Sequence, residues 1–183
     1  MGVDINGNVP SRRWPPVGGG RGSMFGVPEA RKPPVAFETT CVVAALPDEV
    51  YHHLTDPNSY VGLSPLIVAV RDVRTSHDAQ GHVVAHYVAV ERFRLAGPVR
   101  WDNPIRVRMV ATRPGEQLVS EVRSPGRVSL RAVVDLAAVA GGTRVREGVT
   151  ADAPVPLRRF VAAKARQVAA YRAAELARRM AAR

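Results

Sequence analysis

Two glutamates occupy the apolar face of predicted strands, an unusual place for a side chain that is charged at neutral pH. Glu91 and Glu147 each fall in a period-two alternation of mostly apolar residues. A carboxylate that leaves water either finds a partner or holds its proton to higher pH, and such a group is suited to general acid and base catalysis. Glu91 and Glu147 are therefore the candidate catalytic residues. Their faces are shared by Val83, Ala85, Tyr87, Phe93 and Leu95, and by Thr143, Val145, Val149 and Ala151.

The two glutamates allow two interpretations. In the first, Tyr87, Glu91, Glu147 and Lys164 supply the polar contacts of an otherwise apolar ligand site, because a few polar groups fix a ligand's orientation. Lys164 is then one partner for the carboxylates. In the second, a β-bulge turns the glutamates outward, or they form ion pairs at the rim of a sheet. The apolar residues predicted to complete the ligand site are Phe93, Met109, Phe160 and Val168.

The sequence shows little sign of a metal site, a reactive thiol or a nucleotide-binding motif. His82 and His86 are four residues apart on a predicted strand, about 13 Å along it, which is too far for both to bind one metal ion. Cys41 sits in an apolar strand without an activating basic neighbour, so we expect a buried, unreactive thiol. Phosphate-binding glycine loops, nucleophile elbows and zinc-protease motifs are missing from the sequence. We therefore expect neither a metal nor a cofactor.

The elements that must position these side chains are predicted from periodicity and turn residues. A strand at 35–44 precedes a helix that opens at Pro47-Asp48-Glu49 and stops at Asp56-Pro57-Asn58. Six short strands joined by turn residues follow, which predicts an antiparallel meander with one face in water. Their predicted ranges are 66–74, 82–95, 105–112, 117–123, 128–139 and 143–152.

A long helix is predicted from Leu157 to about Met180. Apolar residues in its first half form a stripe about 140° wide, which predicts packing against an apolar surface. Past Tyr171 the stripe carries charged residues, so we expect the last turns to extend into solvent. The stripe consists of Leu157, Phe160, Val161, Ala165, Val168 and Tyr171, and the charged residues beyond it are Arg172, Glu175 and Arg179.

The net charge of the 183-residue chain is +10, and it lies at the two ends. Residues 1–34 carry +3 and residues 154–183 carry +7, whereas residues 35–152 are neutral. Because 13 of the first 34 residues are proline or glycine, we expect a disordered extension before a folded domain at 35–183. The basic C-terminal helix is expected to meet solvent, an anionic membrane or an acidic protein. Specific nucleic-acid binding is not expected, since only 5% of residues are aromatic.

The expected location is the cytoplasm. The sequence has no run of 18 apolar residues, no apolar leader of the signal-peptide type and a single cysteine. We therefore expect no membrane-spanning helix and no disulfide framework.

The order of strand, short helix, six-stranded meander and long helix resembles the START-like helix-grip superfamily, in particular its polyketide cyclase/dehydrase and lipid-transfer branch. Thr39 to Pro57 resembles the family's opening strand and helix, and Gly141 to Val145 is similar to the turn before its last strand. The resemblance covers residues 35–183, with Leu63 standing where many relatives carry tryptophan. It implies an α+β fold in which a curved antiparallel sheet of about seven strands wraps around the C-terminal helix and leaves an apolar cavity.

Three functions stay open from the sequence, as do the ligand and the oligomeric state. The cavity implied by the resemblance favours binding or transport of a hydrophobic small molecule, such as a lipid or a polyketide. A cyclase or dehydrase that uses a cavity carboxylate as general acid and base is the second function. The third is a basic interaction module that binds an anionic surface through its tail and C-terminal helix.

Overall fold

The computed structural model describes residues 34–94 and 97–182. The predicted disordered extension lies outside the described residues, apart from Pro34. The helices are α1 (Pro47–Thr55), α2 (Tyr60–Leu63) and α3 (Arg158–Ala181), with short 3-10 helices η1 (Pro57–Ser59) and η2 (Val155–Leu157). The strands are β1 (Val35–Val43), β2 (Ile67–His77), β3 (Val83–Arg94), β4 (Arg100–Arg113), β5 (Gln117–Ser124), β6 (Val128–Val139) and β7 (Gly142–Asp152).

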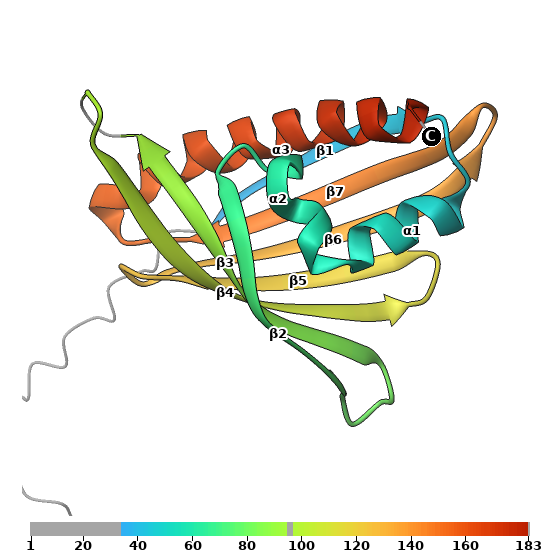
Figure 1. Cartoon of the computed structure of the whole chain (residues 1–183), viewed down its shortest axis with the longest axis horizontal. Coiled ribbons are helices and arrows are strands. Elements are labelled where there is room, and N and C mark those ends of the chain that lie inside the picture. The colour runs from blue at the N-terminus through green and yellow to red at the C-terminus, as the bar shows by residue number, and fades with distance from the viewer. Residues whose placement is uncertain (1–33, 95–96, 183) are drawn as a thin grey trace, which may run out of the picture. The chain divides into compact units, whose positions relative to one another are not determined.

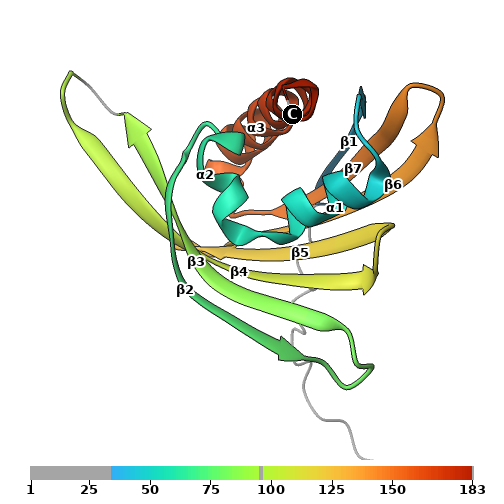
Figure 2. The same ribbon diagram turned by 45° about the vertical axis from the view of Figure 1, so that its right-hand side comes forward.

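The described strands form one antiparallel sheet in the order β1-β7-β6-β5-β4-β3-β2. The sheet is strongly curved, and α3 lies on its concave side together with α1 and α2 (Figures 1 and 2). Consecutive strands from β2 to β7 are neighbours, as short turns between them require. The predicted helix-grip fold of seven strands around a long C-terminal helix is confirmed.

The pairing of β3 with β4 decides which way Glu91 points. The two strands pair without a register shift from Val84 opposite Val110 to Arg94 opposite Arg100. Because a regular ladder keeps the alternation of side chains, no bulge turns Glu91 outward. The β4 ladder also runs through Pro104, where a strand start at Ile105 was expected. Proline removes only its own N–H, so the ladder continues on both sides of it.

The main core joins α1, the sheet and the second half of α3. Val50 and Leu54 of α1 pack in one cluster with Leu176 and Met180 of α3. The α1 helix begins at Pro47, and the Glu49 carboxylate accepts a hydrogen bond of 3.0 Å from the Leu46 N–H in front of it. This contact satisfies a backbone donor that the helix leaves unpaired at its start.

The prediction that the last turns of α3 extend into solvent is wrong. The buried side chains of the helix are Ala169, Leu176 and Met180, all in its middle and second half. Arg179, one of the charges that seemed to end the apolar stripe, donates hydrogen bonds of 2.8 and 3.0 Å to the carbonyl oxygens of Ser59 and Val61. Charged side chains at these positions are therefore used inside the domain.

The first half of α3 shows the opposite departure from the expected pattern. Phe160 is 53% exposed and Tyr171 is 44% exposed, although both belong to the predicted apolar stripe. Phe160 remains accessible because it faces a cavity that protein atoms do not fill. The helix is thus anchored at its C-terminal end and covers a cavity at its N-terminal end.

Candidate functional site

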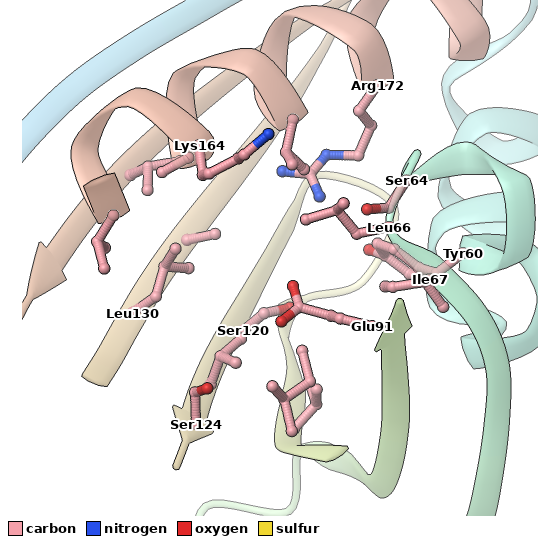
Figure 3. Close-up of a pocket in the computed structure, with 18 of the residues that line it drawn as sticks. Tyr60, Ser64, Leu66, Ile67, Glu91, Ser120, Ser124, Leu130, Lys164 and Arg172 are labelled. Atoms are coloured by element: carbon pink, nitrogen blue, oxygen red, sulfur yellow. The ribbon is translucent and has the colours of Figure 1, made fainter. Parts of the chain in front are cut away.

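A cavity of about 320 Å³ lies between the first half of α3 and the concave face of the sheet (Figure 3). Strands β1 and β3 to β7 line it together with α3 and the segment from Tyr60 to Ile67. Most of the lining side chains are aliphatic or aromatic, because every second residue of each strand points inward. Its volume is within the range of small-molecule sites, which begins near 300 Å³.

The cavity opens at one end of the sheet. Four of its lining residues are exposed, and they are Trp101, Pro125, Leu157 and Phe160. They come from the β3–β4 hairpin, the β5–β6 turn and the start of α3. Phe93 joins two of these regions, since its ring centroid lies 5.4 Å from that of Trp101 and 6.3 Å from that of Phe160. An aromatic cluster therefore borders the opening, which we call the mouth.

An ion pair stands in the cavity wall away from the mouth. The Arg172 guanidinium of α3 donates through Nε and Nη2 to the two carboxylate oxygens of Glu147 on β7, with 3.2 Å between Nε and Oε2. Their side chains are 20% and 10% exposed. Burial works against the charge of Arg172, yet Glu147 and two nearby phenols hold its pKa above the ordinary value. Charge neutralisation of this kind is what makes a buried arginine tolerable.

The two phenols belong to Tyr60 and Tyr87. Burial raises the pKa of Tyr60 to about 12, with Arg172 opposing the rise, and burial also raises the pKa of Tyr87. Both phenols therefore keep their protons at neutral pH and are available to donate a hydrogen bond to a ligand in the cavity that they line.

Glu91 forms a second polar group, with Asn103 and Ser124. Asn103 is 4% exposed, and its Nδ2 donates bonds of 3.0 Å to Glu91 Oε2 and of 3.0 Å to Ser124 Oγ. Burial raises the pKa of Glu91, while the Asn103 hydrogen bond opposes that rise. No lysine or arginine of the described residues forms an ion pair with Glu91. Glu91 consequently keeps its proton to a higher pH than a glutamate in water does.

The Asn103 amide suits both protonation states of Glu91. Its Oδ1 is buried and has no hydrogen-bond partner among the described residues. In the structure, the Asn103 amide nitrogen donates to the Glu91 carboxylate. If the amide group rotated by 180°, its Oδ1 would accept a hydrogen bond from a protonated Glu91. Glu91 can therefore gain and lose a proton while it keeps one hydrogen bond to Asn103.

Seven of the eight predicted site residues line the cavity. They are Tyr87, Glu91, Phe93, Glu147, Phe160, Lys164 and Val168. Met109 does not: it is 3% exposed and packs in a core cluster with Ala85 and Val107. The alternation correctly placed Met109 on the inward face of β4, but its predicted position in the ligand site is wrong, because that face reaches the cavity only from Trp101 to Val107. The roles of these residues as ligand contacts or catalysts stay predictions.

Lys164 is not the partner of either glutamate. Its Nζ donates a 3.0 Å hydrogen bond to Gln167 Oε1, one helical turn away. Figure 3 shows Lys164, Arg172 and Glu91 directed into the same space. Arg172 takes the role that was assigned to Lys164, and it lies two turns further along α3 on the same side of the helix.

Sequence analysis also missed Tyr60, Asn103, Ser120 and Ser124 as lining residues. Ser120 and Ser124 share the inward face of β5 with Val122, so the alternation along that strand held the signal. Asn103 lies before Ile105, where the predicted strand began, whereas β4 begins at Arg100. Tyr60 lies in the connection between α1 and β2, where no periodicity indicates a direction.

The histidines and the cysteine were expected to contribute neither a metal site nor a reactive thiol. His82 Nδ1 is 3.0 Å from an Asp78 carboxylate oxygen in the β2–β3 turn. Cys41 lines the cavity, and burial, followed by the Glu147 charge, raises the pKa of its thiol. Among the described residues, no three histidine, cysteine or acidic side chains gather as metal ligands would. Within the same part of the chain, no helix is both long and apolar enough to cross a membrane.

Comparisons with known proteins agree on the fold. A family model described as polyketide cyclase/dehydrase and lipid transport matches residues 34–183. A START superfamily protein from Mycobacterium smegmatis superposes with a TM-score of 0.63 at 12% identity, over 79% of this chain and 96% of its own. The Zhui aromatase/cyclase from Streptomyces sp. R1128 has a TM-score of 0.60 at 16% identity, over 79% of this chain and 92% of its own.

A third solved structure is larger than this chain. The di-domain ARO/CYC StfQ from the steffimycin biosynthetic pathway has a TM-score of 0.59 at 13% identity, over 81% of this chain. This chain spans 50% of that protein's length. A search of curated proteins gives no significant match. At these identities the solved structures show a common fold.

Proposed function

The chain belongs to the polyketide cyclase/dehydrase and lipid-transport family, and we propose that it binds a hydrophobic small molecule in the cavity under α3. The observation that carries the proposal is an apolar cavity of about 320 Å³ that is open at one end and has polar side chains in its walls. Removal of apolar ligand surface from water supplies the binding free energy, at about 25 cal/mol per Å².

The polar side chains indicate that the ligand carries oxygen-containing groups along an otherwise apolar body. Lys164 and the phenol of Tyr60 are donors, and Glu91 accepts or donates according to its protonation. A purely hydrocarbon ligand would displace water from these groups and leave their remaining hydrogen-bonding capacity unused, which costs free energy. A hydroxylated or keto-substituted lipid-like or polycyclic molecule satisfies them.

The proposal is tested by filling the cavity. Ser120 points into it from β5 (Figure 3), and Ser120→Phe places a ring in the middle of the site. Ser129→Phe is the matched control, because Ser129 is exposed on the neighbouring strand β6. The probe is N-phenyl-1-naphthylamine, an uncharged dye whose fluorescence rises in apolar surroundings. We expect saturable binding to the wild-type chain and to Ser129→Phe, and loss of binding in Ser120→Phe.

Circular dichroism of Ser120→Phe shows whether the sheet has formed, which separates a filled cavity from an unfolded chain. Equal dye binding by a folded Ser120→Phe chain would contradict the proposal. Native mass spectrometry of freshly purified protein gives a second measurement, in which a bound molecule should accompany the wild-type chain and be missing from Ser120→Phe. Binding of one molecule per chain would also identify the ligand by its mass.

A second function, dehydration of a bound ligand, is favoured by Glu91. A buried carboxyl group with a raised pKa and no cationic partner among the described residues suits a general acid and base. Glu91 would take the proton from a carbon next to a ketone and deliver it to the hydroxyl group on the following carbon. The C–H and C–O bonds break, a C=C bond forms and water leaves, so atoms and charge balance. Glu147 is less suited, since both of its carboxylate oxygens already accept hydrogen bonds from Arg172.

Glu91→Gln separates the two functions. It removes the proton-transfer group and keeps an amide oxygen to accept from Asn103. If the protein is a dehydrase, the variant binds the dye like the wild type but loses turnover of a β-hydroxy-ketone polycycle, followed by ultraviolet absorbance. Unchanged turnover in Glu91→Gln would rule out Glu91 as the catalyst.

A further inference from the structure

Large apolar side chains project into solvent around the mouth of the cavity. Five of them stand on the β3–β4 hairpin, on η2 and at the start of α3, and they form what we call the mouth surface. Their exposed fractions are 55% for Val99, 49% for Trp101, 72% for Val155, 39% for Leu157 and 53% for Phe160. Exposed apolar side chains that are gathered in one place usually mark an interaction site.

Arginines lie on the segments that border the mouth. Arg94 and Arg100 belong to the β3–β4 hairpin, Arg127 to the β5–β6 turn, and Arg158 and Arg159 to the start of α3. Arg94 and Arg100 stand opposite each other in the β3–β4 ladder. The β5–β6 turn that carries Arg127 lies against Leu157, because a Cβ atom added to Gly126 would be 3.6 Å from Leu157 Cδ1. None of the five arginines forms an ion pair with another described residue. Because Arg94 and Arg100 alternate with the inward-facing Phe93 and Trp101, they lie on the convex face of the hairpin, and the arginines nearest the apolar side chains of the mouth surface are Arg127, Arg158 and Arg159.

We propose that the mouth surface docks on an anionic lipid bilayer. Tryptophan and phenylalanine insert between lipid headgroups, while arginines at the same level contact lipid phosphates. A bilayer requires no matching shape, which suits side chains that are spread over two loops and a helix start. The cavity then opens directly onto the lipid, so an apolar ligand passes between them without crossing water. Docking itself needs no ligand and does not depend on the proposed function.

Charge distinguishes the bilayer from other occupants. Residues 1–34 include apolar side chains such as those of Trp14, Met24 and Phe25 that could cover the mouth, but the net charge of +3 on this segment repels the arginines. An acidic protein would match the charge, yet it would also have to match five separate apolar contacts in shape. Helix α3 was expected to meet an anionic surface through residues 172–183. Arg172 and Arg179 of that segment are engaged inside the domain, so the proposed surface uses the arginines at the opposite end of the helix.

Trp101 reports on docking directly. In a full-length chain with Trp14→Phe, Trp101 is the remaining tryptophan. Without lipid it should be quenched by iodide, in keeping with its 49% exposure. Vesicles of equal parts phosphatidylglycerol and phosphatidylcholine should shift its emission to shorter wavelength and protect it from iodide. Vesicles of phosphatidylcholine alone should have little effect, and added salt should reverse the shift.

Charge reversal at the mouth tests the role of the arginines. Arg158→Glu/Arg159→Glu should weaken partitioning onto the anionic vesicles at least about 30-fold, from the contribution of each basic residue near such a surface. The control is Arg74→Glu/Arg144→Glu, which changes the charge equally with exposed arginines at the other end of the sheet. This control should weaken partitioning much less.

Three results would overturn the proposal. Equal losses in the two double variants would show attraction by net charge alone. Protection of Trp101 from iodide without vesicles would show that another part of the chain covers the mouth. Unchanged Trp101 emission on anionic vesicles, with a shift on an acidic polypeptide such as polyglutamate, would point to a protein partner.

Discussion

Arg172 of α3 and Glu147 of β7 form a two-point ion pair in the wall of the cavity, across 25 residues of sequence. The pair connects the helix to the sheet midway between the core below α1 and the open mouth. Its side chains are only 20% and 10% exposed, so each charge depends on the other for compensation. Removal of one partner leaves the other charge buried alone, which costs more than removal of both.

We therefore expect Arg172→Met to lower the free energy of unfolding by about 3–5 kcal/mol, the usual cost of an uncompensated buried charge. Urea denaturation at neutral pH measures the change. The double variant Arg172→Met/Glu147→Gln should recover most of the loss, because no charge is left unpaired. A double variant as unstable as the single one would show that packing of the arginine side chain, and not its charge, stabilises the domain.

The arrangement of strands and turns was predictable because it depends on local patterns. Each strand alternates apolar and polar residues, and each turn contains glycine, proline or asparagine and aspartate, so strand order and inward faces could be derived without long-range information. The alternation placed Glu91 and Glu147 on the inward face of the sheet, and the resemblance to the helix-grip superfamily implied the cavity that this face lines.

The partner of Glu147 was not predictable in the same way. Arg172 follows Tyr171 in a helix rich in arginine and alanine, where a charged residue normally marks the solvent side. Only the packing of α3 across β7 shows that this arginine faces a carboxylate. The same packing buries Leu176 and Met180, which had been assigned to an exposed end. Local periodicity predicts which face of a helix is buried, whereas the number of helical turns that pack on the sheet depends on the length of the sheet beneath them.

Side-chain truncation should cost much more stability in the second half of α3 than in the first half. Leu176→Ala removes a side chain that is 2% exposed and should lower the free energy of unfolding by about 2–5 kcal/mol. Phe160→Ala removes a larger side chain that is 53% exposed, and the loss should be about 0.5 kcal/mol or less. Thermal unfolding of the two variants gives the comparison. A larger loss in Phe160→Ala would mean that the first half of α3 anchors the helix after all.

Gly142, at the start of β7, should not tolerate a side chain. Its φ is +139°, and an added Cβ would lie 2.0 Å from the Val43 carbonyl oxygen, so backbone would have to move. Gly141 next to it has a φ of +84° but open space around it. Gly141→Ala should therefore cost only the backbone strain of about 1–2 kcal/mol. Gly142→Ala should cost clearly more and should loosen the β1–β7 pairing, which hydrogen exchange of β1 amides can detect.

The protonation of Glu91 should make stability depend on pH. An unfolded chain releases this proton near pH 4.5, whereas burial raises the pKa of Glu91 in the folded domain. Above the unfolded value, the folded state binds more protons than the unfolded state, so stability falls as pH rises through the folded pKa. Glu91→Gln has no proton to lose at this position, so its stability does not fall in this way. The difference in free energy of unfolding between Glu91→Gln and the wild type should therefore favour the variant more at about pH 7 than at about pH 4.

The control for this effect is Glu116→Gln, which changes an exposed carboxylate in the β4–β5 turn. Comparison of urea midpoints at the two pH values cancels the contributions of all other titrating groups, since they are common to variant and wild type. A Glu91→Gln difference that is the same at both pH values would mean that Glu91 ionises in the folded domain as it does in water. The same result would remove the basis for Glu91 as a general acid, so this measurement tests the chemistry of the cavity without knowledge of the ligand.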